Sequence, residues 1–183
     1  MIIKLLNLYL IELNLITINL LFLEHVNKDK VEIIDFTNDL KNHIKTLNYE
    51  WLNKYFRIEK GDELSLTNPK EEIIDKGGMI FYAKLNGEIV GTASLLKKSE
   101  KIFELGKMSV ASYVQGCKIG TLLLEHCLNV LRQKKIEKCI LYSNTTLESA
   151  IHLYRKYGFV EIELEPGLYE RANIKMQKIM YFF

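Results

Sequence analysis

Apolar residues recur with a period of two in some stretches of the chain and at helical spacing in others, and this change of period predicts the secondary structure. Stretches with strand composition lie at residues 31–36, 79–85, 88–96, 103–110, 138–143, 159–164 and 173–180. Helical spacing predicts helices that begin near Asn38, Pro69, Ile119 and Thr145. The helix from Ile119 is expected to bury one stripe, made of Leu122, Leu123, Cys127, Val130 and Leu131.

Turn signals between these stretches predict how the strands connect. Asn86 and Gly87 separate two apolar runs, and an Asn-Gly pair in this setting is typical of a tight β-hairpin. The strands at 79–85, 88–96 and 103–110 should therefore form an antiparallel meander. The later order of strand, helix and strand predicts a parallel crossover. The sequence thus predicts an α/β domain with a mixed, mostly antiparallel sheet of about seven strands, flanked by helices.

The helix near Thr145 has a start signal and a stop signal. Thr145 is followed three residues later by Glu148, a spacing that predicts a capping box. Gly158 is expected to end the helix, because glycine readily takes the left-handed conformation that closes a helix.

The chain begins with an apolar stretch, residues 2–23, in which 16 of 22 residues are apolar. This stretch is long enough to cross a bilayer, but Lys4, Glu12 and three asparagines interrupt it, and a mid-span acid alone costs about 2.5 to 3.5 kcal/mol. No small-residue cleavage site of a signal peptide follows. We expect residues 1–29 to be an apolar extension, either packed on the domain of residues 30–183 or poorly ordered. Membrane attachment is the alternative.

Composition and charge narrow the classes of function. The chain has 25 basic and 23 acidic residues, a net charge of +2, and the basic residues are scattered, so no field would steer nucleic acid. Cys117, Cys127 and Cys139 are odd in number and lack the spacing of zinc ligands. We therefore expect a cytoplasmic protein without a disulfide framework, a metal site or a nucleic-acid partner.

Residues 114–120, with the sequence VQGCKIG, carry the strongest functional signal. They join a predicted strand to a predicted helix, so N–H groups of a glycine-containing turn and of the first helical turn point to one place. The helix macrodipole adds roughly half a positive charge there. Such a site can bind phosphate. The alternative is an ordinary connection between a strand and a helix.

A second segment, Ser143–Phe159, contains a strand end, a capped helix and a glycine stop, with Tyr154 in the last helical turn. Together the two segments resemble the acetyl-CoA-binding half of the GCN5-related N-acetyltransferase (GNAT) superfamily, and the resemblance covers roughly residues 31–180. It implies a sheet that is splayed between its fourth and fifth strands. It also implies transfer of an acetyl group from acetyl-CoA to a primary amine by direct attack in a ternary complex, without a metal. The alternative is a non-catalytic acyl-CoA-binding regulatory module.

The resemblance assigns coenzyme binding mainly to backbone groups. The phosphate-binding positions of the family fall on Gln115, Gly116, Cys117, Lys118, Ile119 and Gly120. Lys118 stands where the family has a glycine. We expect Lys118 to be already helical, with Gly116 supplying the flexibility of the turn, so that the ammonium can add charge near the diphosphate. A left-handed conformation at Lys118 is the alternative and would be strained by about 1 kcal/mol or more.

The same resemblance places the pantetheine arm against the backbone of Met108 and Val110, because a peptide-like ligand can bind an unpaired strand edge. An asparagine that is common in the family is Leu147 here. We expect Asn144, at the strand end, to make the contact of that asparagine.

Two residues are implied to take part in proton transfer. Tyr154 occupies the position from which a tyrosine protonates the departing thiolate; the alternative is that Tyr154 is only a core residue. Glu104 lies eleven residues before Gln115, where some members have a general base. The alternatives for Glu104 are an outward-facing strand residue, or a carboxylate that acts through a water relay.

The acceptor-binding residues are less clear from the sequence. Tyr49 and Trp51 lie in an aromatic cluster where the family places acceptor contacts, although such clusters are more often core. Tyr169 and Arg171 lie in a turn before the last strand. Arg171 is expected either to pair with a substrate carboxylate or to be solvated. The acceptor is a small-molecule amine or a protein amine, and a homodimer is compatible with the sequence.

Overall fold

The computed structural model describes residues 31–165, 167 and 169–181 of the chain. The predicted N-terminal extension therefore lies outside the described residues. In the described part, no helix is both long and apolar enough to span a bilayer.

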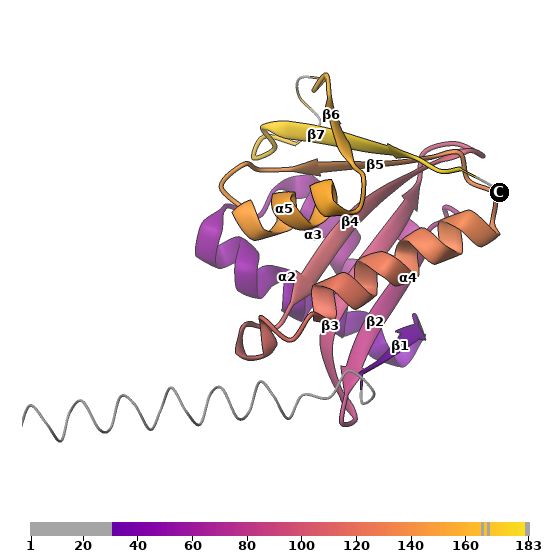
Figure 1. Cartoon of the computed structure of the whole chain (residues 1–183). Helices are drawn as coiled ribbons and strands as arrows, with labels where there is room; N and C mark the ends of the chain where they lie inside the picture. The colour runs from indigo at the N-terminus through magenta and orange to yellow at the C-terminus, as the bar shows by residue number, and fades with distance from the viewer. Residues whose placement is uncertain (1–30, 166, 168, 182–183) are drawn as a thin grey trace, which may run out of the picture.

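The described residues form one seven-stranded sheet with the strand order β1-β2-β3-β4-β5-β7-β6 (Figure 1). Its strands are β1 Val31–Asp35, β2 Met79–Leu85, β3 Glu88–Lys97, β4 Ile102–Val110, β5 Lys138–Ser143, β6 Val160–Ile162 and β7 Ile174–Ile179. Every neighbouring pair is antiparallel except β4 and β5, which are parallel. The predicted mixed, mostly antiparallel sheet and its parallel crossover are confirmed.

Helices cover both faces of the sheet, with α2 and α3 on one side and α4 and α5 on the other (Figure 1). The helical elements are η2 Asn38–Leu40, α2 Lys41–Tyr55, α3 Lys60–Thr67, η3 Lys70–Ile74, η4 Ser112–Val114, α4 Ile119–Gln133 and α5 Glu148–Lys156. Of these, α3 was not predicted. It offers only one buried apolar residue, Leu66, because Asp62 and Ser65 occupy the rest of its buried face.

Helix α4 packs closely on the sheet where it crosses β3. A Cβ atom at Gly91 would lie 3.0 Å from Leu123 Cδ1 and 3.2 Å from Ile119 Cγ2, so only glycine lets the first turns of α4 pack so closely. The buried stripe of α4 includes Leu123, Leu124, Cys127, Leu128 and Leu131. The predicted stripe is therefore right in part: Leu122 and Val130 are only half-buried.

The turn predictions had mixed outcomes. Asn86 and Gly87 both have positive φ, 50° and 92°, as the predicted hairpin requires. Gly158, with φ 81°, ends α5 as expected. The predicted capping box at Thr145 is wrong: Leu147 is the N-cap residue of α5 and no side chain of the described residues caps it. The backbone N–H of Thr145 instead donates to Oδ1 of Asn173 at 2.8 Å, which ties this loop to β7.

Candidate functional site

The sheet opens between its two parallel strands. β4 and β5 pair at only three positions, where residues 102–104 lie beside residues 138–140. Beyond Glu104, β4 continues to Val110 beside β3 alone, while the end of β5 pairs with β7. We call this opening the splay. It confirms the expected splay between the fourth and fifth strands, and it leaves one edge of β4 without a neighbouring strand.

A β-bulge interrupts β4 at the splay. Thr92 pairs with Ser109, but Ser94 pairs with Gly106, so Lys107 and Met108 together lie opposite a single residue of β3. Lys107 takes a left-handed φ of 50° to accommodate the extra residue. We call residues 107–108 the bulge. No local pattern in the sequence predicted it.

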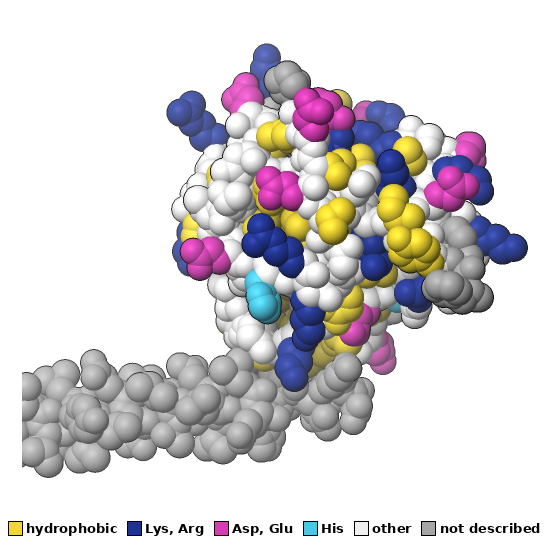
Figure 2. Space-filling model, turned by 45° about the horizontal axis from the view of Figure 1, so that its top comes forward, with side chains coloured by type: hydrophobic (Ala, Val, Ile, Leu, Met, Phe, Trp, Pro, Cys, Tyr) yellow, Lys and Arg dark blue, Asp and Glu magenta, His cyan; other side chains and the backbone are white. Residues whose placement is uncertain are grey.

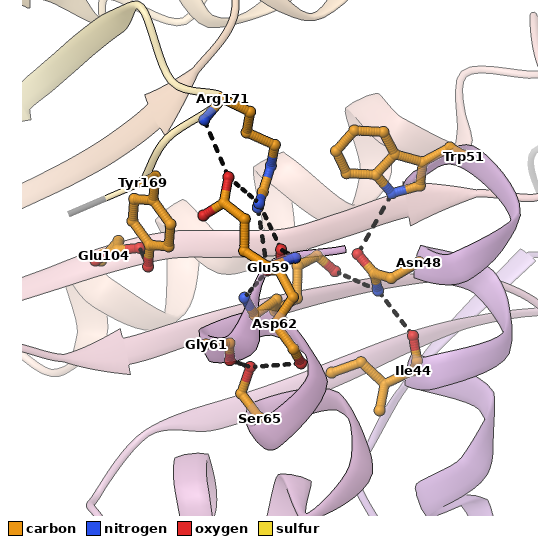
Figure 3. Close-up of polar contacts among 11 residues, drawn as sticks. Ile44, Asn48, Trp51, Glu59, Gly61, Asp62, Ser65, Glu104, Tyr169 and Arg171 are labelled. Atoms are coloured by element: carbon orange, nitrogen blue, oxygen red, sulfur yellow. Dashed lines mark hydrogen bonds and ion pairs between the residues drawn. The ribbon is translucent and has the colours of Figure 1, made fainter. Parts of the chain in front are cut away.

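Helix α2 fixes the bulge from the other side of the sheet. The buried Asn48 amide donates to the carbonyl oxygen of Lys107 at 3.3 Å, and Ser109 Oγ donates to the carbonyl oxygen of Leu47 at 2.7 Å. Trp51 Nε1 donates to Oδ1 of Asn48 at 3.4 Å (Figure 3). Trp51 thus positions Asn48, the residue that binds the bulge. Tyr49 instead packs against the core cluster that includes Ile44 and Leu52, and Lys45 Nζ lies 5.1 Å from its ring centroid.

The predicted phosphate-binding turn leads from the end of β4 into α4. Gly116 has φ 88°, and Lys118 is the N-cap residue of α4 with φ 61° and ψ 13°. The expectation that Lys118 is already helical is therefore wrong. The chain reverses direction here, with the Cys117 N–H donating to Val114 O at 3.3 Å, and a second left-handed residue is needed before the helix begins. This conformation costs an exposed lysine about 1 to 2 kcal/mol.

The start of α4 offers free backbone donors beside the splay. The N–H groups of its first turn have no acceptor within the helix, and no side chain of the described residues caps them. A Cβ atom at Gly120 would lie 3.5 Å from Met108 Cε and 3.9 Å from Val110 Cγ2, which are ordinary contacts. A Cβ atom at this position would therefore clash with no described protein atom. The absence of a side chain at Gly120 leaves space between α4 and β4. These features fit an extended, peptide-like ligand that ends in a diphosphate. Gln115 Nε2 lies 3.5 Å from the carbonyl oxygen of Val110, at the rim of this space.

Tyr154 brings a phenol to the splay from α5. Its hydroxyl lies 4.0 Å from Met108 Sδ, and its ring centroid lies 5.8 Å from that of Phe159. Burial raises the pKa of Tyr154 to about 12, so the phenol stays protonated and can donate a hydrogen bond at neutral pH. Tyr154 is thus part of the core and its hydroxyl also faces the bulge, while its role as a proton donor stays a prediction.

Glu104 is buried at the last position where β4 and β5 pair. Only 3% of Glu104 is exposed, so the alternative of an outward-facing residue is wrong. Its Oε1 atom accepts a hydrogen bond of 2.7 Å from the Tyr169 hydroxyl (Figure 3). Lys98 Nζ forms an ion pair with Oε2 at 3.1 Å, but Oε2 has no hydrogen-bond partner with good geometry among the described residues.

Next to Tyr169 lies a cluster of four charged residues, Glu59, Asp62, Lys107 and Arg171, which we call the Asp62 cluster. Figure 3 labels Glu59, Asp62 and Arg171 of this cluster. The two guanidinium NH groups of Arg171 bind the two carboxylate oxygens of Asp62, with 3.0 Å between NH2 and Oδ1. Lys107 Nζ donates to Asp62 Oδ1 at 2.7 Å. Arg171 also contacts Glu59 Oε1 at 3.0 Å. Arg171 was a candidate from the sequence, but no local pattern predicted its partners, because the members of the cluster come from three separate segments.

The contacts of two predicted site residues bear on their expected roles: both alternatives for Arg171 are wrong, and the coenzyme contact of Asn144 stays a prediction. Arg171 is neither solvated nor open to a substrate carboxylate, because its guanidinium already forms the bidentate pair with Asp62 and its side chain is 19% exposed. The amide of Asn144 donates to the carbonyl oxygen of Arg171 at 2.7 Å, and Oδ1 of Asn144 accepts from the backbone of Thr146 at 3.0 Å. Asn144 thus holds the turn that carries Arg171.

The charges around Asp62 set its ionisation. Burial alone would raise the pKa of Asp62, but the ammonium of Lys107 and the guanidinium of Arg171 favour the carboxylate more strongly, so the pKa lies below the ordinary value of 3.8. Asp62 therefore remains an anion at neutral pH although its side chain is only 1% exposed.

An open groove of about 600 Å³ adjoins the outer side of this cluster, between the end of α2 and residues 170–171. Its lining includes Tyr55, Phe56, Arg57, Glu59, Glu170 and Arg171. A second open groove, of about 720 Å³, is lined by residues of β1, η2 and the β2–β3 hairpin and includes none of the predicted site residues. Figure 2 shows basic and acidic side chains interspersed over the face that it presents.

The described residues contain no group of three or more His, Cys, Asp or Glu side chains that is arranged to hold a metal ion. Cys117, Cys127 and Cys139 are all free thiols. Burial raises the pKa of the half-buried Cys117 thiol, which disfavours the reactive thiolate.

Comparison with known proteins relates this architecture to one family. The model of the acetyltransferase (GNAT) family matches residues 46–159. An uncharacterized N-acetyltransferase of Dictyostelium discoideum is 35% identical over 63 residues, which are 34% of this chain and 29% of that relative. The chain thus matches less than a third of the length of that relative.

Solved structures share the fold at lower identity. A GNAT-family acetyltransferase from Staphylococcus aureus Mu50 has a TM-score of 0.75 and 23% identity, covering 82% of this chain and 99% of the other. A spermidine N-acetyltransferase from Vibrio cholerae, solved with CoA and spermine, has a TM-score of 0.65 and 17% identity, covering 84% and 97%.

Proposed function

Because the chain belongs to the acetyltransferase (GNAT) family, we propose that it moves an acetyl group from acetyl-CoA to a primary amine by direct attack in a ternary complex. The observation that carries this proposal is the splay: the free edge of β4 lies between the donors at the start of α4 and the buried phenol of Tyr154. The arrangement can hold a diphosphate at one end and a reacting thioester at the other.

The coenzyme would be held by the main chain. Donors in the turn of residues 115–120 would bind the diphosphate, where the dipole of α4 favours negative charge. The edge of β4 at Met108 and Val110 would bind the peptide-like pantetheine arm as a strand binds its neighbour. Gly120 would leave the passage between them open.

In the reaction, the amine nitrogen attacks the thioester carbonyl, the C–S bond breaks and the thiolate leaves. N–H groups on the free edge of β4 would polarise the carbonyl. Tyr154, which burial keeps protonated, would donate its proton to the departing thiolate, and the proton that the nitrogen loses as the amide forms would return to the Tyr154 oxygen directly or through water.

The attacking amine must first lose a proton, because an unperturbed amine of pKa near 10.4 is almost fully protonated at pH 7. Glu104 is the acid that lies buried beside the splay, and its Oε2 atom has no hydrogen-bond partner with good geometry in the described part of the chain. We assign Glu104 the role of base, acting directly or through a water molecule.

The acceptor would enter from the groove beside residues 170–171, where Tyr169 covers Glu104. An amine is the acceptor class that the family supports, and a relative that acetylates spermidine has the same fold. We propose a small-molecule amine or a protein amine as the acceptor, since the groove is open to solvent.

The test is release of free thiol from acetyl-CoA by the purified full-length chain, measured with a panel of amines, together with calorimetry of coenzyme binding. We expect binding, and thiol release with at least one amine. Binding without release on a broad panel would favour the non-catalytic acyl-CoA-binding module. Absence of binding would overturn the proposal.

A further inference from the structure

The Asp62 cluster connects three parts of the chain that meet only in the folded structure. Asp62 lies on α3, Lys107 forms the bulge of β4, and Arg171 lies in the turn of residues 169–171. Asp62 is 45 residues from Lys107 and 109 residues from Arg171 in the sequence. One carboxylate therefore links the strand edge at the splay to the turn that carries Tyr169.

The contacts of the Asp62 carboxylate fix the orientation of its partners as well as balancing their charge. Its two oxygens receive the planar fork of Arg171 and the ammonium of Lys107 at the same time, and its side chain is 1% exposed. A bidentate pair fixes orientation as well as distance. Glu59, which forms a capping box with Asp62 at the start of α3, also accepts the backbone N–H of Arg171 at 3.0 Å.

Tyr169 is held between these charges and Glu104. Lys107 Nζ lies 5.9 Å and Arg171 Cζ 5.7 Å from its ring centroid, so two cations of the cluster contact the same ring. The hydroxyl at the other end of the ring donates to Glu104. A shift of Arg171 or Lys107 would thus move the ring that orients Glu104.

We propose that Asp62 is a positioning residue, which holds the turn of residues 169–171 against the bulge and thereby places Tyr169 and Glu104 for the acceptor amine. The inference rests on the proposed function for its kinetic consequence. Its structural part, the tethering of the turn, does not depend on that function. Asp62 itself contacts no reacting atom in this scheme.

The experiment compares Asp62→Asn and Arg171→Lys with the unmodified chain. The matched control is Asp75→Asn, which breaks a lysine–aspartate pair of 2.8 Å whose side chains are about half exposed. We expect Asp62→Asn to raise KM for the amine at least tenfold and to lower kcat, while the Kd for CoA changes less than twofold. Arg171→Lys, which keeps the charge but not the fork, should show a smaller change in the same direction. Asp75→Asn should change neither constant.

Amide hydrogen exchange tests the tether without any turnover. The Arg171 amide should exchange at least tenfold faster in Asp62→Asn, while the amide of Leu141 in β5 reports global opening and should change less. Equal acceleration at both amides would show a general loss of stability and would overturn the proposal, as would an unchanged KM for the amine in both variants.

If Asp62→Asn does not fold, both the kinetic and the exchange measurements are made on Arg171→Lys. If the unmodified chain acetylates no amine, the proposed function fails, and the exchange measurement alone still decides whether Asp62 tethers the turn.

Discussion

The hydroxyl of Tyr169 donates a hydrogen bond of 2.7 Å to Oε1 of Glu104, although 65 residues separate the two in the sequence. Glu104 is 3% exposed, so this donor replaces water that the carboxylate would otherwise bind. The pair joins the last paired position of β4 and β5 to the turn that borders the open groove beside residues 170–171. The same bond can be tested for its contribution to stability.

Replacing Tyr169 by Phe removes one donor from a buried carboxylate. Because hydrogen bonds to charged groups contribute about 1.5 to 3 kcal/mol, we expect the free energy of unfolding to fall by about that amount. Tyr113→Phe is the matched control, since the Tyr113 hydroxyl donates to Glu88 at the same 2.7 Å in an exposed position. That change should cost less than about 0.5 kcal/mol. Urea unfolding of both variants measures the difference, and equal losses would contradict the prediction.

Tyr154→Phe tests the leaving-group role. The ring and its packing are kept, so coenzyme affinity should stay within about a factor of two, while loss of a general acid should lower kcat by about 100-fold or more. Tyr157→Phe is the control on the same helix segment, because the exposed Tyr157 hydroxyl binds Glu125 instead. It should leave kcat unchanged. An unaltered kcat in Tyr154→Phe would remove Tyr154 from the mechanism.

Gly120→Ala separates protein packing from ligand space. The added Cβ would meet only ordinary contacts within the protein, and alanine in place of a helical glycine should raise stability by about 0.5 to 1 kcal/mol. If the coenzyme passes this position, its Kd should rise at least tenfold. Gly61→Ala in α3, where a Cβ would meet nothing within 4 Å, should raise stability without affecting Kd. An unchanged Kd in Gly120→Ala would place the coenzyme elsewhere.

Lys118→Gly tests the left-handed N-cap residue. Removing the Cβ should relieve strain and raise the free energy of unfolding by about 1 kcal/mol. At low salt we also expect coenzyme affinity a few-fold below that of the unmodified chain, because an exposed ammonium near a diphosphate is lost. This difference should shrink at high salt, which screens the attraction in the unmodified chain. Lys135→Gly, at φ 55° beyond the end of α4, should give the same gain in stability with no change in affinity. Equal affinities in the two variants would exclude a role for the Lys118 ammonium.

The low pKa of Asp62 predicts a dependence of stability on pH. A carboxyl group that is more acidic in the folded than in the unfolded state stabilises the fold above its ordinary pKa of 3.8, and this contribution is lost as pH falls below that value. At pH 7, Asp62→Asn should lower the free energy of unfolding, since it leaves Lys107 without its carboxylate partner and Arg171 with Glu59 alone. The difference between the variant and the unmodified chain should narrow below about pH 4. Urea unfolding from pH 7 to pH 3.5 measures it, and a difference that stays constant would contradict the assignment.

Local patterns were enough to predict most of the sheet and helix α4. The Asn86–Gly87 hairpin, the parallel β4–β5 pair and the end of α5 at Gly158 each depend on residues that are close in sequence or on a repeated apolar period. The family resemblance, and not the helical spacing, implied a position for Tyr154 beside the coenzyme, and its hydroxyl lies 4.0 Å from Met108 Sδ of β4. α3 escaped prediction because its buried face carries Asp62 and Ser65 in place of an apolar stripe.

The motif at residues 114–120 was located correctly, but it did not determine the backbone conformation of Lys118. The sequence places a glycine at 116 and a helix after 118, and both a helical and a left-handed lysine satisfy that pattern. The tertiary structure decides between them, because the chain must turn from the end of β4 into a helix that packs closely on Gly91. That packing is strong enough to outweigh a strain of about 1 to 2 kcal/mol.

By itself, then, the sequence determined the order of the strands and of the longer helices other than α3, the turn that leads into α4 and the family that these motifs resemble, since each depends on residues that are close in the sequence. Only the tertiary structure decided that Arg171 binds Asp62, that Lys107 forms a bulge and that Glu104 is buried beneath Tyr169. The physical reason is that the fold determines which charged side chains lie close enough to form ion pairs. A lysine or an aspartate looks the same in a sequence whether water or a buried counterion surrounds it.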